Sequence, residues 1–322
     1  MFKKFSVFVF FLLSANTLFA YNINSRYKES EIVLRTATGN ISGTLTIPNK
    51  PNISPLVLII AGSGPTDRDG NNNFGTKTDA YKMLAEELAK KGISSLRYDK
   101  RGIGKSMLAL KKESDIRFDN YVDDAVAWIS LIKADKRFSK IFIAGHSEGS
   151  LIGILATLQT NIDGFISIAG AGRRADKIII EQINNNNPKY LNETKTILDS
   201  LLKGKIVDSV GIAMKSLFRK SVQPYIISWL KYDPANEIKN IKVPVLIIQG
   251  NTDIQVSVED AKLLAASNTN AKLVIIENMN HIFKYANSDL KKNLESYNKP
   301  DLPIKKEFTE EIINFINQIT NK

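Results

Sequence analysis

Runs of mostly apolar residues recur along the chain at intervals that suit buried strands. A continuous one, Leu-Val-Leu-Ile-Ile, occupies residues 56–60. Similar runs lie at residues 141–144, 165–169, 245–248 and 273–276, with a weaker one at 94–98. Strands that are apolar on both faces belong to sheets covered on both sides, so these runs predict a buried, mainly parallel sheet. Residues 31–36 and 41–47, which flank the turn 37–40, predict an opening β-hairpin.

Helical patterns separate these runs. Apolar residues fall three or four positions apart in residues 81–88, 122–132 and 308–319. This spacing places them on one face of a helix. Strands that alternate with helices require right-handed crossovers, so the pattern predicts an α/β fold.

One long stretch interrupts the alternation. Residues 172–240 contain no convincing strand but carry amphipathic pieces around residues 178–183 and 197–202. A segment of this length between two sheet strands predicts a helical cap. The core of the fold would then consist of residues 21–171 and 241–322.

The first twenty residues differ from the rest of the chain. Lys3 and Lys4 precede an apolar run at residues 5–13, broken only by one serine, and a more polar stretch leads to Ala20. This is the layout of a secretory signal peptide at residues 1–20. The run is short for the ~20 residues that an uncleaved membrane anchor needs. We expect an exported chain, periplasmic or secreted, with no stable membrane span once the segment is removed.

Composition narrows the chemistry. The chain has 322 residues, of which 43% are hydrophobic, and it has no cysteine. A packed core is expected, while disulfides, thiolate metal sites and a cysteine nucleophile are excluded. The formal net charge is +11, but basic and acidic residues are interleaved and no arginine-rich helix or aromatic–basic motif is present. We therefore expect a basic surface and no nucleic-acid partner.

The residues best suited to chemistry begin directly after an apolar run. The sequence Gly-His-Ser-Glu-Gly at residues 145–149 follows the run 141–144 and precedes the helical segment 151–158. This is a G-x-S-x-G motif in a strand–turn–helix context, where a tight turn exposes the serine oxygen and the glycines avoid Cβ clashes. Ser147 is therefore the candidate nucleophile.

Two histidines occur in the whole chain. His146 adjoins Ser147, where the turn should direct its ring away from the serine oxygen, so we interpret it as structural. His281 follows the apolar run 273–276 after a short loop. This is the carboxyl end of the last predicted strand, where ligand sites collect in open α/β sheets. His281 is the candidate base.

With a G-x-S-x-G nucleophile, the acid that orients the base should lie between the serine and the histidine in sequence. Asp253 fits because it ends the turn after the apolar run 245–248. Its carboxylate would hold the imidazole in the tautomer that accepts the serine proton. Glu277 is the reserve acid, and Glu259 and Asp260 are weaker candidates.

These motifs resemble those of the α/β-hydrolase superfamily over residues 30–320. Residues 99–106 resemble the D-x-R-G-x-G-x-S loop after the fourth strand of many members, and residues 250–253 resemble their G-x-x-D acid turn. Residues 61–71 are similar to the G-S-G-P-x-D-R-D-G-N loop of a bacterial branch grouped with serine aminopeptidase-like and acyl-esterase-like hydrolases, although Ala61 stands where a histidine is common. The resemblance implies an α/β-hydrolase fold, in which helices flank a mainly parallel central sheet and a helical cap is inserted.

Two backbone N–H groups are expected to form the oxyanion hole. By position, the loop at residues 61–71 should supply the N–H of Ser63, with Gly64 in reserve. The N–H of Glu148, directly after the nucleophile, should supply the other. Each such donor is worth roughly 3–4 kcal/mol when it points at the developing charge.

The remaining polar motifs do not predict a nucleotide or metal site. Asp67, Arg68 and Asp69 either brace their loop through salt bridges or contact the substrate. A P-loop needs glycine where Asp99 stands, and a dinucleotide fingerprint needs glycine at position 67. A calcium loop in this region would need its turn glycine at position 72, and the glycine is at position 70.

The sequence thus predicts a serine hydrolase for a small-molecule acyl substrate, without a metal or organic cofactor. Ser147 would attack an ester, thioester or amide carbonyl, His281 would carry the proton, and water would release the acyl group. Carboxylic esters are favoured because nothing visible would recognise a peptide amine. The alternatives are an aminopeptidase-like or thioesterase activity and, in another class, a non-catalytic binding protein on the same fold. The oligomeric state stays open.

Overall fold

The computed structural model describes residues 26–321, so the predicted signal peptide at residues 1–20 lies outside the described residues. Within that range no helix is both long and apolar enough to cross a membrane. The strands are β1 (Tyr27–Thr36), β2 (Gly39–Pro48), β3 (Ser54–Ile60), β4 (Ser94–Tyr98), β5 (Phe138–His146), β6 (Gly164–Ile168), β7 (Val245–Gly250) and β8 (Lys272–Ile276).

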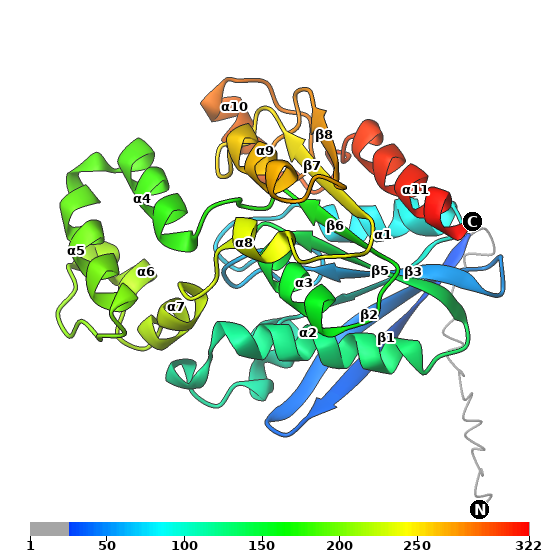
Figure 1. Ribbon diagram of the computed structural model, residues 1–322, viewed down its shortest axis with the longest axis horizontal. Coiled ribbons are helices and arrows are strands. Elements are labelled where there is room, and N and C mark those ends of the chain that lie inside the picture. The colour runs from blue at the N-terminus through cyan, green and yellow to red at the C-terminus, as the bar shows by residue number, and fades with distance from the viewer. Residues whose placement is uncertain (1–25, 322) are drawn as a thin grey trace, which may run out of the picture.

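These strands form an eight-stranded sheet in the order β1-β2-β4-β3-β5-β6-β7-β8 (Figure 1). β1 and β2 form the predicted antiparallel hairpin, and β2 pairs antiparallel with β4. From β4 to β8 all neighbouring strands are parallel. Each apolar run that predicted a buried strand coincides with a strand of this sheet, which confirms the α/β fold.

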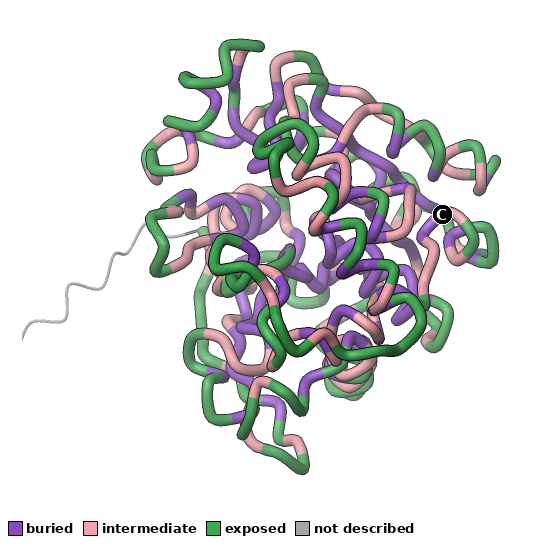
Figure 2. The backbone as a smooth tube through the Cα atoms, turned by 90° about the vertical axis from the view of Figure 1, so that its left-hand side faces the viewer, coloured by how far each residue is buried: buried purple, intermediate pink, exposed green. Residues whose placement is uncertain are grey.

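Helices cover both faces of the sheet, and alternate strand residues point to each cover. In β3, Leu56 and Leu58 pack in the cluster with α2 (Phe118–Lys133), α3 (Glu148–Gln159) and α9 (Val258–Ser267). Val57 and Ile59 pack on the opposite face with α1 (Ala80–Lys90) and α11 (Lys306–Thr320). Buried positions gather in the interior of the molecule, while exposed positions lie on its outer turns (Figure 2). This double cover explains why the strands are continuously apolar.

Between β6 and β7 the chain leaves the sheet and forms α4 (Ala175–Asn186), α5 (Leu191–Leu202), α6 (Lys215–Phe218), α7 (Gln223–Trp229) and α8 (Pro234–Ile238). Helices α4 to α7 stand beside the sheet (Figure 1) and share an apolar cluster of their own, which includes Ile197, Phe218 and Ile226. Ile238 in α8 packs instead in the cluster of the sheet. The inserted helices therefore have a separate core that ends before α8.

The remaining helix, α10 (Leu290–Glu295), follows β8 and precedes α11 in the chain. Short 3-10 turns occupy Gly104–Ala109, Glu113–Asp115, Pro188–Tyr190, Ile212–Met214 and Ser296–Asn298.

Candidate active site

Ser147 lies between the end of β5 and the start of α3, in a backbone conformation that side chains rarely adopt (φ 54°, ψ −120°). Its N–H donates to the carbonyl of Ile168 at the end of β6 (2.9 Å). Gly145 and Gly149 allow this turn, because a Cβ on Gly145 would lie 2.2 Å from the Gly149 carbonyl oxygen, and one on Gly149 would lie 2.4 Å from that of Ile60. The close approach of β3, β5 and α3 thus holds the serine at the carboxyl edge of the sheet in a strained turn.

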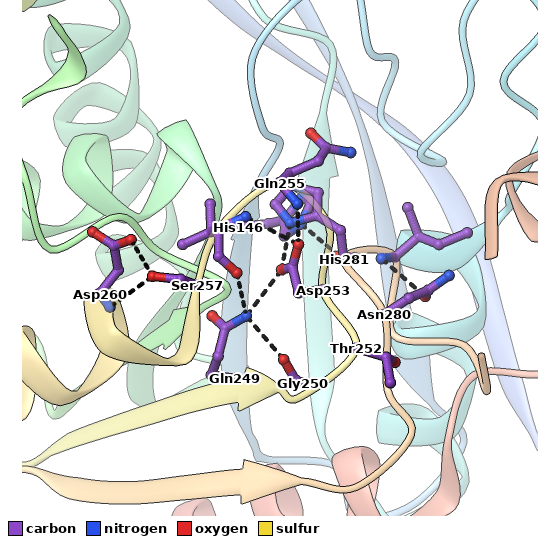
Figure 3. A network of polar contacts seen from close by, with 12 residues as sticks. His146, Gln249, Gly250, Thr252, Asp253, Gln255, Ser257, Asp260, Asn280 and His281 are labelled. Carbon is purple, nitrogen blue, oxygen red and sulfur yellow. Dashed lines mark hydrogen bonds and ion pairs between the residues drawn. The ribbon is translucent and has the colours of Figure 1, made fainter. Parts of the chain in front are cut away.

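Asp253 and His281 come together at the same edge, after β7 and β8. Asp253 Oδ2 accepts a hydrogen bond from His281 Nδ1 (2.7 Å), and the two side chains are 1% and 5% exposed. The carboxylate also accepts from Gln249 Nε2 (2.9 Å), Gln255 N–H (2.7 Å) and Val256 N–H (3.0 Å) (Figure 3). The bond to Nδ1 fixes the tautomer in which Nε2 accepts a proton.

The loop that carries His281 is fixed by the side chain of Asn280 (Figure 3). The side-chain oxygen Oδ1 of Asn280 accepts the N–H groups of Ile282 (3.3 Å) and Lys284 (3.1 Å). Its amide donates to the hydroxyl of Ser296 (2.7 Å). The imidazole is therefore positioned by its loop as well as by the carboxylate.

The other acidic candidates have different surroundings. Glu277 and Glu259 are exposed, and Asp260 is paired with Arg173 (2.6 Å). Among residues 26–321, none of these three carboxylates bonds to His281.

Ser147 and His281 line one cavity of about 180 Å³. Within the described part of the chain, neither the Ser147 hydroxyl nor His281 Nε2 makes a hydrogen bond. Catalytic hydrogen bonds are often long in an unliganded site and tighten in the complex with substrate. Both atoms are therefore available to a substrate.

His146, interpreted from the sequence as structural, is buried in a chain of hydrogen bonds. Its Nε2 lies 2.9 Å from the His281 carbonyl oxygen, which can only accept, so Nε2 carries the hydrogen. Nδ1 then accepts from the Tyr81 hydroxyl (2.6 Å), whose oxygen accepts the Gly62 N–H (3.1 Å). Burial, together with the neighbouring His281, lowers the pKa of His146 well below its usual value, so the ring stays neutral. This chain ties the loop after β3 to the loop after β8.

The two expected oxyanion donors lie on either side of the serine. Ser63 follows β3 and lines the cavity, and Glu148 is the first residue of α3. Within residues 26–321 neither backbone N–H has an acceptor, so both are available to a substrate oxygen. Gly64, the reserve donor, does not line the cavity.

A buried lysine supports this region, and it was not anticipated from the sequence. Lys100 Nζ donates to the Gly62 carbonyl (2.6 Å) and to Glu148 Oε2 (3.3 Å), with the lysine and glutamate side chains 1% and 2% exposed. The Tyr225 hydroxyl, from α7, donates to the other oxygen of Glu148. The Glu148 side chain is thus held between the core and the inserted helices.

The charged residues of the loop after β3 have internal partners. Arg68 is buried and its guanidinium pairs with Asp99 (2.7 Å), while Asp69 accepts from Arg97 Nε (2.7 Å). Asp67 Oδ1 accepts two backbone N–H groups of its own loop, each at 2.9 Å. These contacts favour the loop brace over substrate contact, the two roles that the sequence left open for Asp67, Arg68 and Asp69.

The strand order, the serine turn between β5 and α3, and the Asp–His pair after β7 and β8 are features of the α/β-hydrolase fold. A family model described as "Serine aminopeptidase, S33" matches residues 72–223. Esterase EstD of Thermotoga maritima is 26% identical over 276 residues, which are 80% of this chain and 60% of that protein. The monoglyceride lipase homolog of monkeypox virus is 24% identical over 259 residues, 76% of this chain and 88% of that protein. This chain thus spans less than two thirds of the length of the Thermotoga esterase.

Solved structures agree on the fold. Est1E from Butyrivibrio proteoclasticus with bound ferulic acid superimposes with a TM-score of 0.62 at 20% identity, covering 90% of this chain and 100% of that one. An esterase of Pyrococcus furiosus gives a TM-score of 0.57 at 18% identity, with 91% and 92% covered. The chain therefore has the α/β-hydrolase fold.

Proposed function

We propose that the protein hydrolyses carboxylic esters, with Ser147 as nucleophile, His281 as base and Asp253 as the orienting acid. The observation that carries this proposal is the hydrogen bond from His281 Nδ1 to Asp253 Oδ2 (2.7 Å), beside the cavity that Ser147 lines. The similarity to an esterase and to a lipase homolog supports the same reaction.

The reaction has two halves. Ser147 Oγ attacks the ester carbonyl carbon while its proton passes to His281 Nε2, and the N–H groups of Ser63 and Glu148 stabilise the oxyanion. The tetrahedral intermediate breaks its bond to the alcohol oxygen, which takes the proton from Nε2 and leaves an acyl-serine. Water then attacks the acyl carbon and gives its proton to His281. The second tetrahedral intermediate breaks its bond to Ser147 Oγ, which takes that proton back, and the carboxylic acid departs.

An aminopeptidase activity is the alternative, favoured by the description of the family model. An aminopeptidase must recognise a free ammonium group, for which a carboxylate is the natural partner. Glu148 is the one carboxylate among the described residues that line Ser147's cavities, and Lys100 and Tyr225 already occupy its two oxygens. This arrangement favours an ester over a peptide as the substrate.

A fluorophosphonate probe and two chromogenic substrates test the proposal. We expect the probe to label Ser147 in the wild type and to leave Ser147→Ala unlabelled. Nitrophenyl butyrate should be hydrolysed at least a hundred times faster than an aminoacyl nitroanilide. Labelling at another residue, or faster cleavage of the anilide, contradicts the assignment.

A further inference from the structure

Two cavities meet at Ser147. The larger, of about 180 Å³, is lined by His281, and the smaller, of about 90 Å³, is lined by Glu148. Ser63, Ser147 and Gln255 line both. An ester whose carbonyl carbon lies at Ser147 therefore has room on two sides. The reaction mechanism determines which cavity takes the acyl chain and which takes the alcohol.

The proton path assigns the leaving alcohol to the larger cavity. In the proposed mechanism His281 Nε2 gives its proton to the alcohol oxygen, so that oxygen must depart on the imidazole side. The carbonyl oxygen points at the N–H groups of Ser63 and Glu148. The acyl chain is then left with the smaller cavity, where Glu148 is a lining residue and His281 is not.

The smaller cavity combines apolar side chains with polar ones such as Arg173, Gln182 and Gln255. Its walls include Ile178 and Ile179 from α4 and Trp229 from α7, with Leu151 and Val256 from the core. Ligand pockets for drug-sized molecules measure roughly 300–1,000 Å³, so a cavity of about 90 Å³ holds only a short chain.

Among the described residues that line the smaller cavity, Arg173 is the one basic side chain, and its positive charge is paired. Arg173 pairs with Asp260 (2.6 Å) and with Glu181 (2.5 Å). The cavity thus offers no unpaired charge among the described residues that line it, and a neutral hydrocarbon chain suits it.

The larger cavity presents neutral hydrogen-bonding groups. Its lining includes Asn72, Thr76 and Tyr297, and none of its described lining residues is a lysine, arginine, aspartate or glutamate. The Thr76 hydroxyl and the Asn72 Nδ2 make no hydrogen bond within residues 26–321. The Tyr297 oxygen accepts from Gln255 Nε2 (3.2 Å), which leaves its own O–H to donate. Burial raises the pKa of Tyr297, so this donor persists at neutral pH.

We propose that this esterase cleaves short apolar acyl groups from polyhydroxylated neutral alcohols, with the alcohol beside Asn72, Thr76 and Tyr297 and the acyl chain between α4 and α7. The inference rests on the proposed serine-esterase function. It adds a substrate class: each donor without a partner matches a hydroxyl group of a polyol or sugar. The small size and the apolar side chains of the other cavity limit the acid to a short hydrocarbon chain.

Matched substrates test the two halves separately. For the alcohol, glyceryl monobutyrate is compared with ethyl butyrate, and we expect at least a tenfold higher kcat/KM for the glyceryl ester. A butyryl sugar ester run in parallel distinguishes a sugar from a polyol as the preferred alcohol. For the acid, nitrophenyl butyrate should be cleaved faster than nitrophenyl laurate.

Variants then locate each preference. Thr76→Val and Tyr297→Phe should each reduce the glyceryl-to-ethyl ratio about fivefold, the value of one hydrogen bond, without changing the butyrate-to-laurate ratio. Ile179→Ala should move the acyl preference toward laurate, and Ala171→Leu, which fills the same cavity, should move it away. Thr196→Val, an exposed hydroxyl loss on α5, is the control and should change neither ratio.

The outcomes separate the two proposals. Absence of turnover of nitrophenyl butyrate overturns the proposed function itself. Turnover with equal rates for ethyl and glyceryl esters, a preference for laurate, or a change of alcohol preference in Ile179→Ala overturns the substrate class while leaving the esterase intact.

Discussion

The carboxyl edge of the sheet, which carries the proposed active site, and the inserted helices α4 to α7 are held in place by different means. At the edge, short loops are tied to neighbouring strands through the backbone, as in the bonds from Asn251 N–H to the Ile276 carbonyl (3.1 Å) and from Ser147 N–H to the Ile168 carbonyl (2.9 Å). The inserted helices share an apolar cluster of their own. Among them, α7 also packs against α2, where Trp229 stacks on Phe118, and its Tyr225 reaches the edge. The difference implies that the sheet fixes the chemistry, while the insertion can alter selectivity without disturbing it.

The largest effect is expected at the edge itself. Ser147→Ala should lower kcat for nitrophenyl butyrate by about ten-thousand-fold or more, because it removes the nucleophile. The melting temperature should stay nearly unchanged, since the hydroxyl has no hydrogen-bond partner within residues 26–321. Ser130→Ala, on the exposed face of α2, is the control. Residual turnover within tenfold of the wild type would show that the edge does not carry the chemistry.

A second change at the edge leaves its shape intact. Asp253→Asn should lower kcat roughly a thousand- to ten-thousand-fold, because an amide favours the imidazole tautomer that cannot accept the serine proton. Steady-state kinetics together with fluorophosphonate labelling rates provide the measurement. A variant that keeps wild-type kcat would show that Asp253 has no part in the mechanism. It would also contradict the view that the sheet edge determines the chemistry.

A smaller effect is expected where the two regions touch. Tyr225→Phe removes the hydroxyl that binds Glu148 and should lower kcat about five- to tenfold, because the Glu148 N–H is then less firmly positioned. Tyr232→Phe is the matched control, since its hydroxyl binds Asp119 away from the cavities. Equal losses in both variants would mean that the insertion acts through general stability and not through this contact.

The smallest effect concerns stability and pH. Because the pKa of His146 is lowered in the folded state, the unfolded chain binds the extra proton first as pH falls below the histidine's ordinary value of about 6.5. This residue therefore stabilises the fold fully above that pH and progressively less below it, by up to about 1.4 kcal/mol per pH unit. His146→Gln should flatten the decline between pH 7 and 5, as measured by urea unfolding. An unchanged slope would contradict the neutral buried ring.

Much of the edge could be predicted from local pattern, because buried parallel strands are apolar on both faces and their ends supply the site. Ser147 stands in a recognisable turn, and the scarcity of histidine singled out His281. The role of Asp67 stayed open, since its partners are backbone groups of its own loop that only the folded chain specifies.

The contacts between the inserted helices and the sheet edge could not be predicted from local sequence pattern. Tyr225 and Glu148 are 77 positions apart, and no periodicity links residues at that separation. Likewise, nothing in the motif around Lys100 indicates that its ammonium group turns inward to Gly62. Long-range pairing of side chains depends on how helices stack, which the pattern of apolar residues leaves undetermined.

The hydrogen-bonded chain from Gly62 through Tyr81 and His146 to the His281 carbonyl bears on how this protein could be redesigned. The loop after β3 and the loop after β8 are connected by these hydrogen bonds, although they are distant in sequence. A library that randomises either loop alone will therefore mostly recover inactive clones. Productive variants should appear when both loops are diversified together, or when Tyr81 and His146 are kept constant while the residues around them change.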